Sequence, residues 1–186
     1  MKKVILAALV AVASLSANAQ VYLGGTLGFN AGKAVDGADN TTKFQIAPEV
    51  GYSFNEKWAV GLAISFTTAN GDFNENGFPT SATKYGKSST VFGFSPYARY
   101  TFAKTGIASF FLDGGVGFNF YNNDGGTAWQ IGVRPGVKLS ASEKVDFVAQ
   151  LGYLGYAKAS KGQGKGNMFG LNVDNTAIKF GVYYNF

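Results

Sequence analysis

Cysteine and histidine are both absent from this 186-residue sequence. Without cysteine, the chain can form neither a disulfide nor a thiolate metal site. The absence of histidine removes the commonest general base and the commonest ligand of transition metals. Charged residues are scarce as well, at 15% of the chain, against about 25% in a typical protein. These absences disfavour an enzyme, and we expect neither catalytic residues, nor a cofactor, nor a bound metal ion.

Long apolar runs are lacking too, except at the N-terminus. There Lys2-Lys3 precedes an apolar stretch, Val4–Leu15, and Ala17-Asn18-Ala19 has the small-x-small pattern that precedes a signal-peptidase cut. The stretch is well short of the roughly 20 residues that a transmembrane helix needs. We therefore predict a cleaved signal peptide over residues 1–19 and an exported domain over residues 20–186. A permanent N-terminal anchor is the alternative.

A concentrated positive charge is also missing. The 16 basic residues exceed the 11 acidic ones only modestly, and the excess is scattered along the chain. Nothing in this distribution resembles the basic surface of a nucleic-acid-binding protein. We expect no nucleic-acid partner.

What the exported domain has in abundance is alternation of bulky apolar and small residues. A period of two is typical of strands whose two faces meet different surroundings. Eight such segments follow one another, each with about the 9–11 residues that a tilted strand needs to cross a bilayer. In the seventh segment, the apolar face is assigned to Val145, Phe147, Ala149, Leu151 and Tyr153.

The charged residues decide between a soluble and a membrane barrel. All of them beyond residue 19 are predicted in turns, in loops, or on the face that otherwise carries Gly, Ala, Ser and Thr. A Lys or Arg facing lipid at mid-membrane costs roughly 2–4 kcal/mol, and a small-residue face suits the narrow interior of an eight-stranded barrel. We predict an all-β fold, an eight-stranded antiparallel up-and-down transmembrane β-barrel. A soluble periplasmic ligand-binding barrel is the alternative.

The connections and the aromatic residues give the barrel its expected orientation. Connections after the even-numbered segments are short and most of the others are long and polar, which is typical of periplasmic turns and external loops. Both ends of the domain are therefore predicted in the periplasm. Two interfacial girdles are expected: Phe54, Trp58, Phe102, Tyr184 and Phe186 toward the periplasm, and Phe44, Phe66, Phe92, Phe120 and Trp129 toward the outside.

Three prolines interrupt this pattern. Pro48, Pro96 and Pro135 each lie on the apolar face of an even-numbered segment. Proline donates no hydrogen bond to a strand ladder. We expect a bulge or a local ladder gap at each of them.

The signal peptide, the eight segments and the final run Lys179-Phe180-Gly181-Val182-Tyr183-Tyr184-Asn185-Phe186 resemble the small outer-membrane β-barrel family (porin-like, OmpA/OmpX-type). Phe186, with Tyr184 two positions before it, resembles that family's signal for the barrel-assembly machinery. The run Ile46–Tyr52 has the pattern apolar-x-Pro-x-apolar-Gly-Tyr, which resembles a common strand of this family. The resemblance covers essentially the whole exported domain. It implies a protein of the bacterial outer membrane, surrounded by membrane lipid and lipopolysaccharide. We expect a monomer.

Seven charged residues are predicted to face the lumen. Paired carboxylates beside cations could perform acid–base chemistry, but we favour an ion-pair network, because an unpaired charge in a narrow lumen would be costly. Barrel enzymes of this size, the lipid acyltransferases and deacylases, share a His beside a Ser in the active site. This chain has no His. The seven residues are Glu49, Arg99, Asp113, Arg134, Lys138, Asp146 and Lys179.

The predicted loops carry two further candidates. Lys158, Lys161 and Lys165 could bind lipopolysaccharide phosphates by charge attraction, although a solvated loop is favoured. The run Asp72–Gly77 matches the opening of a calcium loop, but Thr83 stands where a bidentate Glu is required.

We thus expect an integral outer-membrane barrel with a largely side-chain-filled lumen that contributes to envelope integrity or displays its loops for adhesion. A narrow porin-like channel for ions or very small solutes is the alternative, because inward glycines could leave a thin polar path. Those glycines are Gly51, Gly61, Gly93, Gly117, Gly132 and Gly152.

Overall fold

The computed structural model describes residues 20–32, 41–70, 89–122, 126–159, 166–172 and 178–186. No helix long and apolar enough to cross a membrane occurs in these segments. Their strands are β1 (Gln20–Gly32), β2 (Thr41–Ser53), β3 (Trp58–Asn70), β4 (Ser89–Thr105), β5 (Ala108–Tyr121), β6 (Thr127–Ser140), β7 (Val145–Leu151), β8 (Tyr153–Ala159), β9 (Gly166–Asn172) and β10 (Ile178–Asn185). The predicted signal peptide, residues 1–19, lies outside the described residues.

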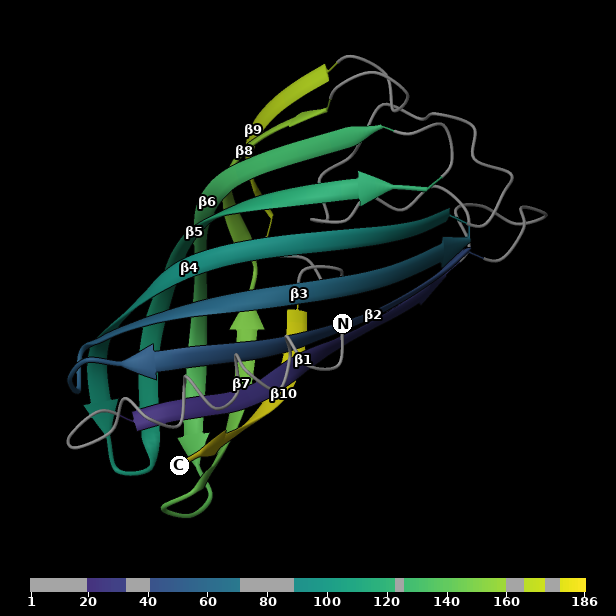
Figure 1. The fold of residues 1–186 in the computed structure, drawn as a ribbon. Coiled ribbons are helices and arrows are strands. Elements are labelled where there is room, and N and C mark those ends of the chain that lie inside the picture. Colours follow the sequence, from purple (N-terminus) through teal and green to yellow (C-terminus); the bar gives the residue numbers. More distant parts are fainter. Residues whose placement is uncertain (1–19, 33–40, 71–88, 123–125, 160–165, 173–177) are drawn as a thin grey trace, which may run out of the picture.

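The strands build eight positions in the wall of a closed antiparallel barrel (Figure 1). From β1 to β6, each strand pairs with the next one along the chain. Both β7 and β8 pair with β6, so that they share the seventh position. The eighth is shared by β9, which pairs with β8, and β10, which pairs with β7 and closes the barrel against β1. The predicted fold class is confirmed.

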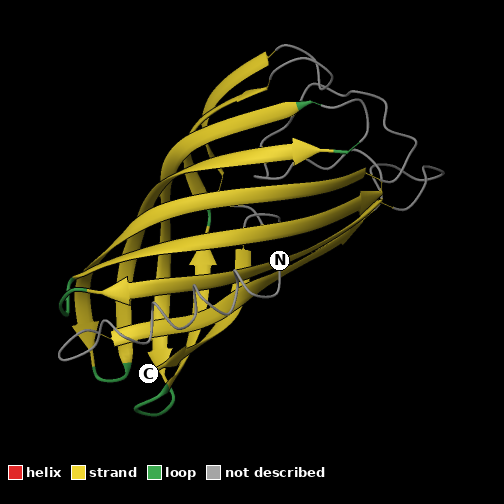
Figure 2. Cartoon of the chain, in the orientation of Figure 1, coloured by secondary structure: helices red, strands yellow, loops and turns green. Residues whose placement is uncertain are grey.

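Tight turns join strands at one end of the barrel, which we call the turn end (Figure 2). In the β2–β3 turn, the side chain of Asn55 accepts hydrogen bonds from the backbone N–H groups of Lys57 and Trp58, both at 2.9 Å. The start of β1 and the end of β10 lie at the same end, because Tyr22 pairs with Asn185. The predicted pattern of short turns is confirmed, and we call the opposite end the loop end.

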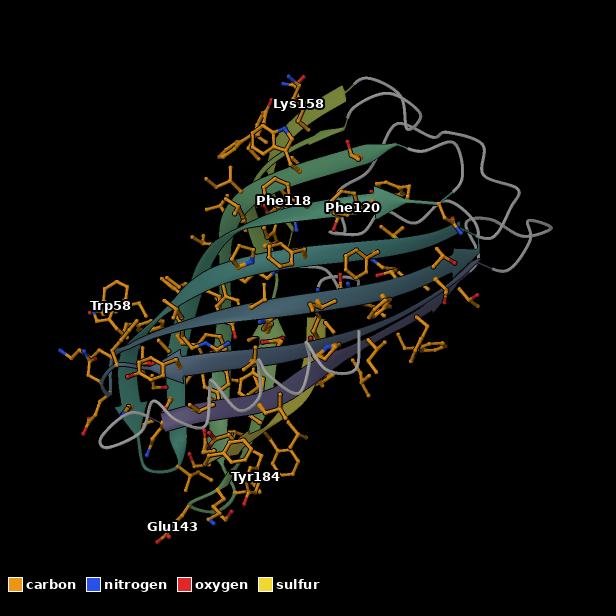
Figure 3. All side chains as sticks on the ribbon, viewed as in Figure 1. Trp58, Phe118, Phe120, Glu143, Lys158 and Tyr184 are labelled. Atoms are coloured by element: carbon orange, nitrogen blue, oxygen red, sulfur yellow. The ribbon has the colours of Figure 1, made fainter. Side chains whose placement is uncertain are left out.

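The bulky apolar side chains point away from the barrel, as predicted (Figure 3). Phe29, for example, keeps 69% of its surface exposed, whereas the lumen-facing Tyr183 keeps 1%. A water-soluble barrel would bury the bulky face and expose the small one. The outward surface therefore requires lipid around it.

Aromatic side chains gather at both ends of this outward surface. At the loop end, the ring of Phe92 lies 5.3 Å from that of Phe66 and 6.2 Å from that of Phe120. At the turn end, Tyr184 and Phe186 stack edge to face at 5.1 Å. The two predicted girdles thus follow the ends of the wall.

A ladder break accompanies each strand proline, as predicted. Opposite Pro48, the β2–β3 pairing skips two residues without changing register. The β4–β5 pairing has a similar gap at Pro96. The β6 strand instead loses its partner beside Pro135, where β7 ends and β8 begins. In each case the proline lacks the N–H group that the ladder needs.

The break between β7 and β8 contradicts part of the predicted seventh segment. Gly152 has a φ of 86° and acts as a bulge, because Gly136 pairs with Gln150 whereas Val133 pairs with Leu154. The extra residue reverses the two faces beyond it. Tyr153, predicted on the lipid face, is therefore buried in the lumen at 4% exposure.

The same reversal corrects the position of Lys158. It lies in β8, not in a loop, and it is exposed on the outward face. Lys161 and Lys165, like the run Asp72–Gly77, lie outside the described residues.

Candidate functional site in the barrel lumen

An arginine–carboxylate pair occupies the centre of the lumen. Arg99 on β4 and Asp113 on β5 are directly opposite in the ladder, both on the inward face. The Nε atom of Arg99 lies 2.6 Å from Oδ1 of Asp113, and its Nη2 lies 2.8 Å from Oδ2. The guanidinium carbon lies 3.9 Å from the centre of the Phe111 ring. Both charges are buried, so the bidentate geometry and the flanking ring offset their loss of water.

A hydrogen bond from Arg99 crosses the lumen. Its Nη2 donates to the hydroxyl of Tyr183 at 3.2 Å. Three strand positions lie between β4 and β10 in either direction around the wall, so this bond joins opposite sides of the barrel. Tyr183 in turn donates to Oε2 of Glu49 on β2, at 2.7 Å.

Two further tyrosines complete the connection. The hydroxyl of Tyr97 donates to the same oxygen of Glu49 at 3.0 Å and lies 2.9 Å from the hydroxyl of Tyr22. On the other side, the amide of Gln150 donates to Asp113 at 3.1 Å. We call the resulting set the Arg99 network: Tyr22, Glu49, Tyr97, Arg99, Asp113, Gln150 and Tyr183.

Glycines on the inward face make room for the tyrosine rings. The ring of Tyr22 covers Gly51 and that of Tyr97 covers Gly61, so closely that a Cβ atom on either glycine would overlap the ring. The predicted inward glycines therefore lie under aromatic side chains at these positions. The small residues let large ones fill the lumen.

A cavity of about 60 Å³ adjoins the Arg99 network and extends toward the loop end. Gln130 lines it, and its buried Oε1 atom has no hydrogen-bond partner among the described residues. Arg134 and Lys179 also line it, and the guanidinium of Arg134 lies 5.0 Å from the centre of the Tyr153 ring. A polar cavity of this size has room for ordered water.

A separate polar cluster lies near the turn end. Asp146 accepts hydrogen bonds from Ser140 at 2.7 Å and from Asn185 at 2.8 Å. The ammonium of Lys138 lies 3.1 Å from the same carboxylate. The seven predicted lumen residues thus divide into three groups: Glu49, Arg99 and Asp113 in the Arg99 network, Arg134 and Lys179 at the cavity, and Lys138 and Asp146 in this cluster.

Sequence reasoning missed several lumen residues. The sequence patterns give no functional role to Tyr22, Tyr97 or Tyr183. Lys43, which is 3% exposed on the inward face of β2, was not singled out either. The sequence does contain a signal for these tyrosines. Each places a large polar ring on the strand face that otherwise carries small residues.

The described part of the chain offers little for chemistry beyond these contacts. It contains no group of three or more acidic residues able to hold a metal ion. The carboxylates of Glu49, Asp113 and Asp146 are each engaged by two or more donors. Such groups are held in place rather than left available to a substrate.

The sequence of this barrel was compared with models of known protein families. Residues 4–186 match the family described as the outer membrane protein beta-barrel domain. The chain belongs to that family. This outer-membrane barrel also resembles Neisserial surface protein A, with a TM-score of 0.53 and 16% sequence identity over 90% of this chain and 97% of that one. Family membership implies a bacterial outer-membrane location.

A second solved structure is similar to this outer-membrane barrel, a major outer membrane protein from Thermus thermophilus. Its TM-score is 0.49 and its sequence identity is 15%, over 91% of this chain and 100% of that one. No curated protein sequence matches the barrel.

Proposed function

We propose that this outer-membrane barrel is a non-conducting, non-enzymatic scaffold that contributes to envelope integrity or displays its loops to partners outside the cell. One observation carries the proposal. The Arg99–Tyr183 hydrogen bond joins opposite walls, and Glu49 extends it to a third side of the lumen. Side chains tied across the lumen in this way leave the loops as the part of the molecule able to meet partners.

A planar-bilayer recording tests the closed lumen. Purified, refolded barrel is added to a bilayer at high salt, and insertion is checked by the heat-modifiable mobility of the protein on a gel. We expect insertion without stepwise currents. Regular current steps from the unmodified protein would contradict the proposal and favour the narrow channel.

The channel is the second candidate, and the observation that favours it is the polar cavity on the loop side of the Arg99 network. Conduction through it would require the network to open. The same recording therefore decides between the two candidates.

The display role is tested on cells. Replacing residues 72–87 with a short Gly-Ser linker removes most of the longest connection and leaves the described wall intact. If that loop binds partners, adhesion of cells that carry this variant falls while surface expression is unchanged. A deletion strain that becomes sensitive to detergent, and that the loop variant rescues, would assign the barrel to envelope integrity instead.

A further inference from the structure

The outward face of the wall carries a cation in an unusual place, at Lys158. The bulge at Gly152 reverses the faces of β8, so that Leu154, Tyr156 and Lys158 point outward. Figure 3 shows Lys158 extending away from the barrel. Every other outward position of β8 is apolar or aromatic. A charged side chain in this position needs a specific partner or access to the membrane surface.

Its neighbours form a row across three strands. Trp129 on β6 pairs with Lys158, which in turn pairs with Asn167 on β9. All three side chains are exposed. The row lies near the loop end, because Trp129 is two residues from the start of β6 and Lys158 is one residue from the end of β8.

An aromatic and apolar surface lies below this row, toward the middle of the membrane. The ring of Tyr156 lies 5.5 Å from that of Trp129. Phe169, the partner of Tyr156 on β9, is 74% exposed. The patch therefore has a cationic and amide edge at the membrane surface and a flat apolar face beneath it, the same order that a lipid headgroup and its acyl chain present.

No carboxylate satisfies this cation within the described wall. Lys158 takes part in none of the ion pairs found among the described residues, such as those of Arg99 with Asp113, Lys104 with Glu56, and Lys138 with Asp146. A lysine stem long enough to reach the interface would place its ammonium group at the level of lipid phosphates. Phosphate charge complements the ammonium, and the Asn167 amide can donate to a phosphate oxygen.

We propose that Lys158 and Asn167, with Trp129 beside them and Tyr156 beneath, form a binding site for a phosphate of a lipid A glycolipid in the outer leaflet. The ammonium and the amide contact the phosphate, and the proximal acyl chain lies along the rings of Tyr156 and Phe169. This site is independent of what the loops bind and of whether the lumen conducts.

The two tryptophans of the chain make a direct test possible. Trp58 lies at the turn end and Trp129 beside Lys158. In a Trp58→Phe background, fluorescence reports only the lipid next to Trp129. The barrel is refolded in vesicles of brominated phosphatidylcholine, which quenches tryptophan, and diphosphoryl lipid A is added as a competitor. We expect lipid A to relieve the quenching at low mole fractions.

Substitutions identify the residue responsible. Lys158→Gln should lower the preference for lipid A over phosphatidylcholine about fivefold, the factor expected from one lysine at an anionic surface, and Lys158→Arg should keep most of it. Lys144→Gln is the matched control, because Lys144 is also exposed beside an aromatic ring, Tyr184, but at the turn end. Its preference should match that of the Trp58→Phe parent.

Three results would overturn the proposal. The first is an unchanged preference in Lys158→Gln, and the second is an equal loss in Lys144→Gln. The third is equal competition by phosphatidylglycerol, which would indicate attraction to any anionic lipid. Heat-modifiable mobility on a gel confirms folding of each variant, and Lys158→Arg keeps the test valid if Lys158→Gln refolds poorly.

Discussion

At the scale of single residues, the buried charge of Arg99 is the feature most sensitive to change. Removing one member of a buried pair leaves the other charged, desolvated and without its partner. Asp113→Ala should therefore lower the free energy of unfolding by about 3–5 kcal/mol, as measured by urea titration of the barrel refolded in vesicles.

The exposed ion pair between Lys104 and Glu56 supplies the control. Their atoms lie 3.3 Å apart, but the side chains are 49% and 87% exposed. Water screens such a pair, and Glu56→Ala should change the unfolding free energy by less than about 1 kcal/mol. Equal effects of the two substitutions would show that the Arg99–Asp113 pair adds nothing by being buried.

The contact between Gly51 and Tyr22 leads to a second prediction at this scale. A Cβ atom at Gly51 would overlap the Tyr22 ring, whereas one at Gly28, also on the inward face, would meet Gln45 at an ordinary 3.7 Å. Gly51→Ala should therefore cost about 1–3 kcal/mol of stability through overpacking. Gly28→Ala should be close to neutral in the same urea titration, and a similar loss in both variants would rule out the ring contact as the cause.

At the scale of elements, the bulge at Gly152 determines which side chains of β8 face the lumen. Its positive φ is strained for any residue with a side chain, so Gly152→Ala should cost about 1–2 kcal/mol. Gly114→Ala is the control, because Gly114 has ordinary backbone angles and the nearest atom to a Cβ there lies 3.8 Å away. Equal stability of the two variants in urea would contradict the strain at Gly152.

The same bulge marks the limit of what periodicity predicts. Alternation predicts the correct faces for most wall strands, because each of them alternates strictly and because a Lys or Arg on the lipid face would be costly. In the seventh, Leu151, Tyr153 and Leu154 are all large, so a one-residue shift leaves the pattern almost as regular as before. Only the ladder to β6 distinguishes the two faces, and a single sequence does not contain it.

At the scale of the whole molecule, contacts across the lumen were the least predictable feature. Alternation placed Glu49, Arg99 and Asp113 on one face, and a narrow lumen implied that they would pair. Alternation does not predict that Arg99 reaches Tyr183. That contact depends on the number of strands that close the barrel and on the stagger between them. The residues 84 positions apart meet only once the wall is complete.

Opening the lumen is the prediction that belongs to this scale. Arg99→Ser combined with Tyr183→Phe removes both groups of the bond that joins opposite walls. The lumen would then contain the carboxylates of Glu49 and Asp113 without the guanidinium that Asp113 pairs with. We expect stepwise currents in planar bilayers, and a reversal potential in a salt gradient that indicates selectivity for cations.

The control makes the same chemical changes on other surfaces. Lys104→Ser combined with Tyr100→Phe also removes one cation and one hydroxyl, but Lys104 is exposed near the turn end and Tyr100 pairs with Trp58 rather than with the lumen groups. This variant should show no stepwise currents. Insertion of the Arg99→Ser, Tyr183→Phe barrel is verified by heat-modifiable mobility. If the inserted variant shows no current steps, the remaining tyrosines and Phe111 block the lumen without the charged pair. Anion selectivity would instead point to Arg134 and Lys179 at the cavity as the charges that an ion meets first.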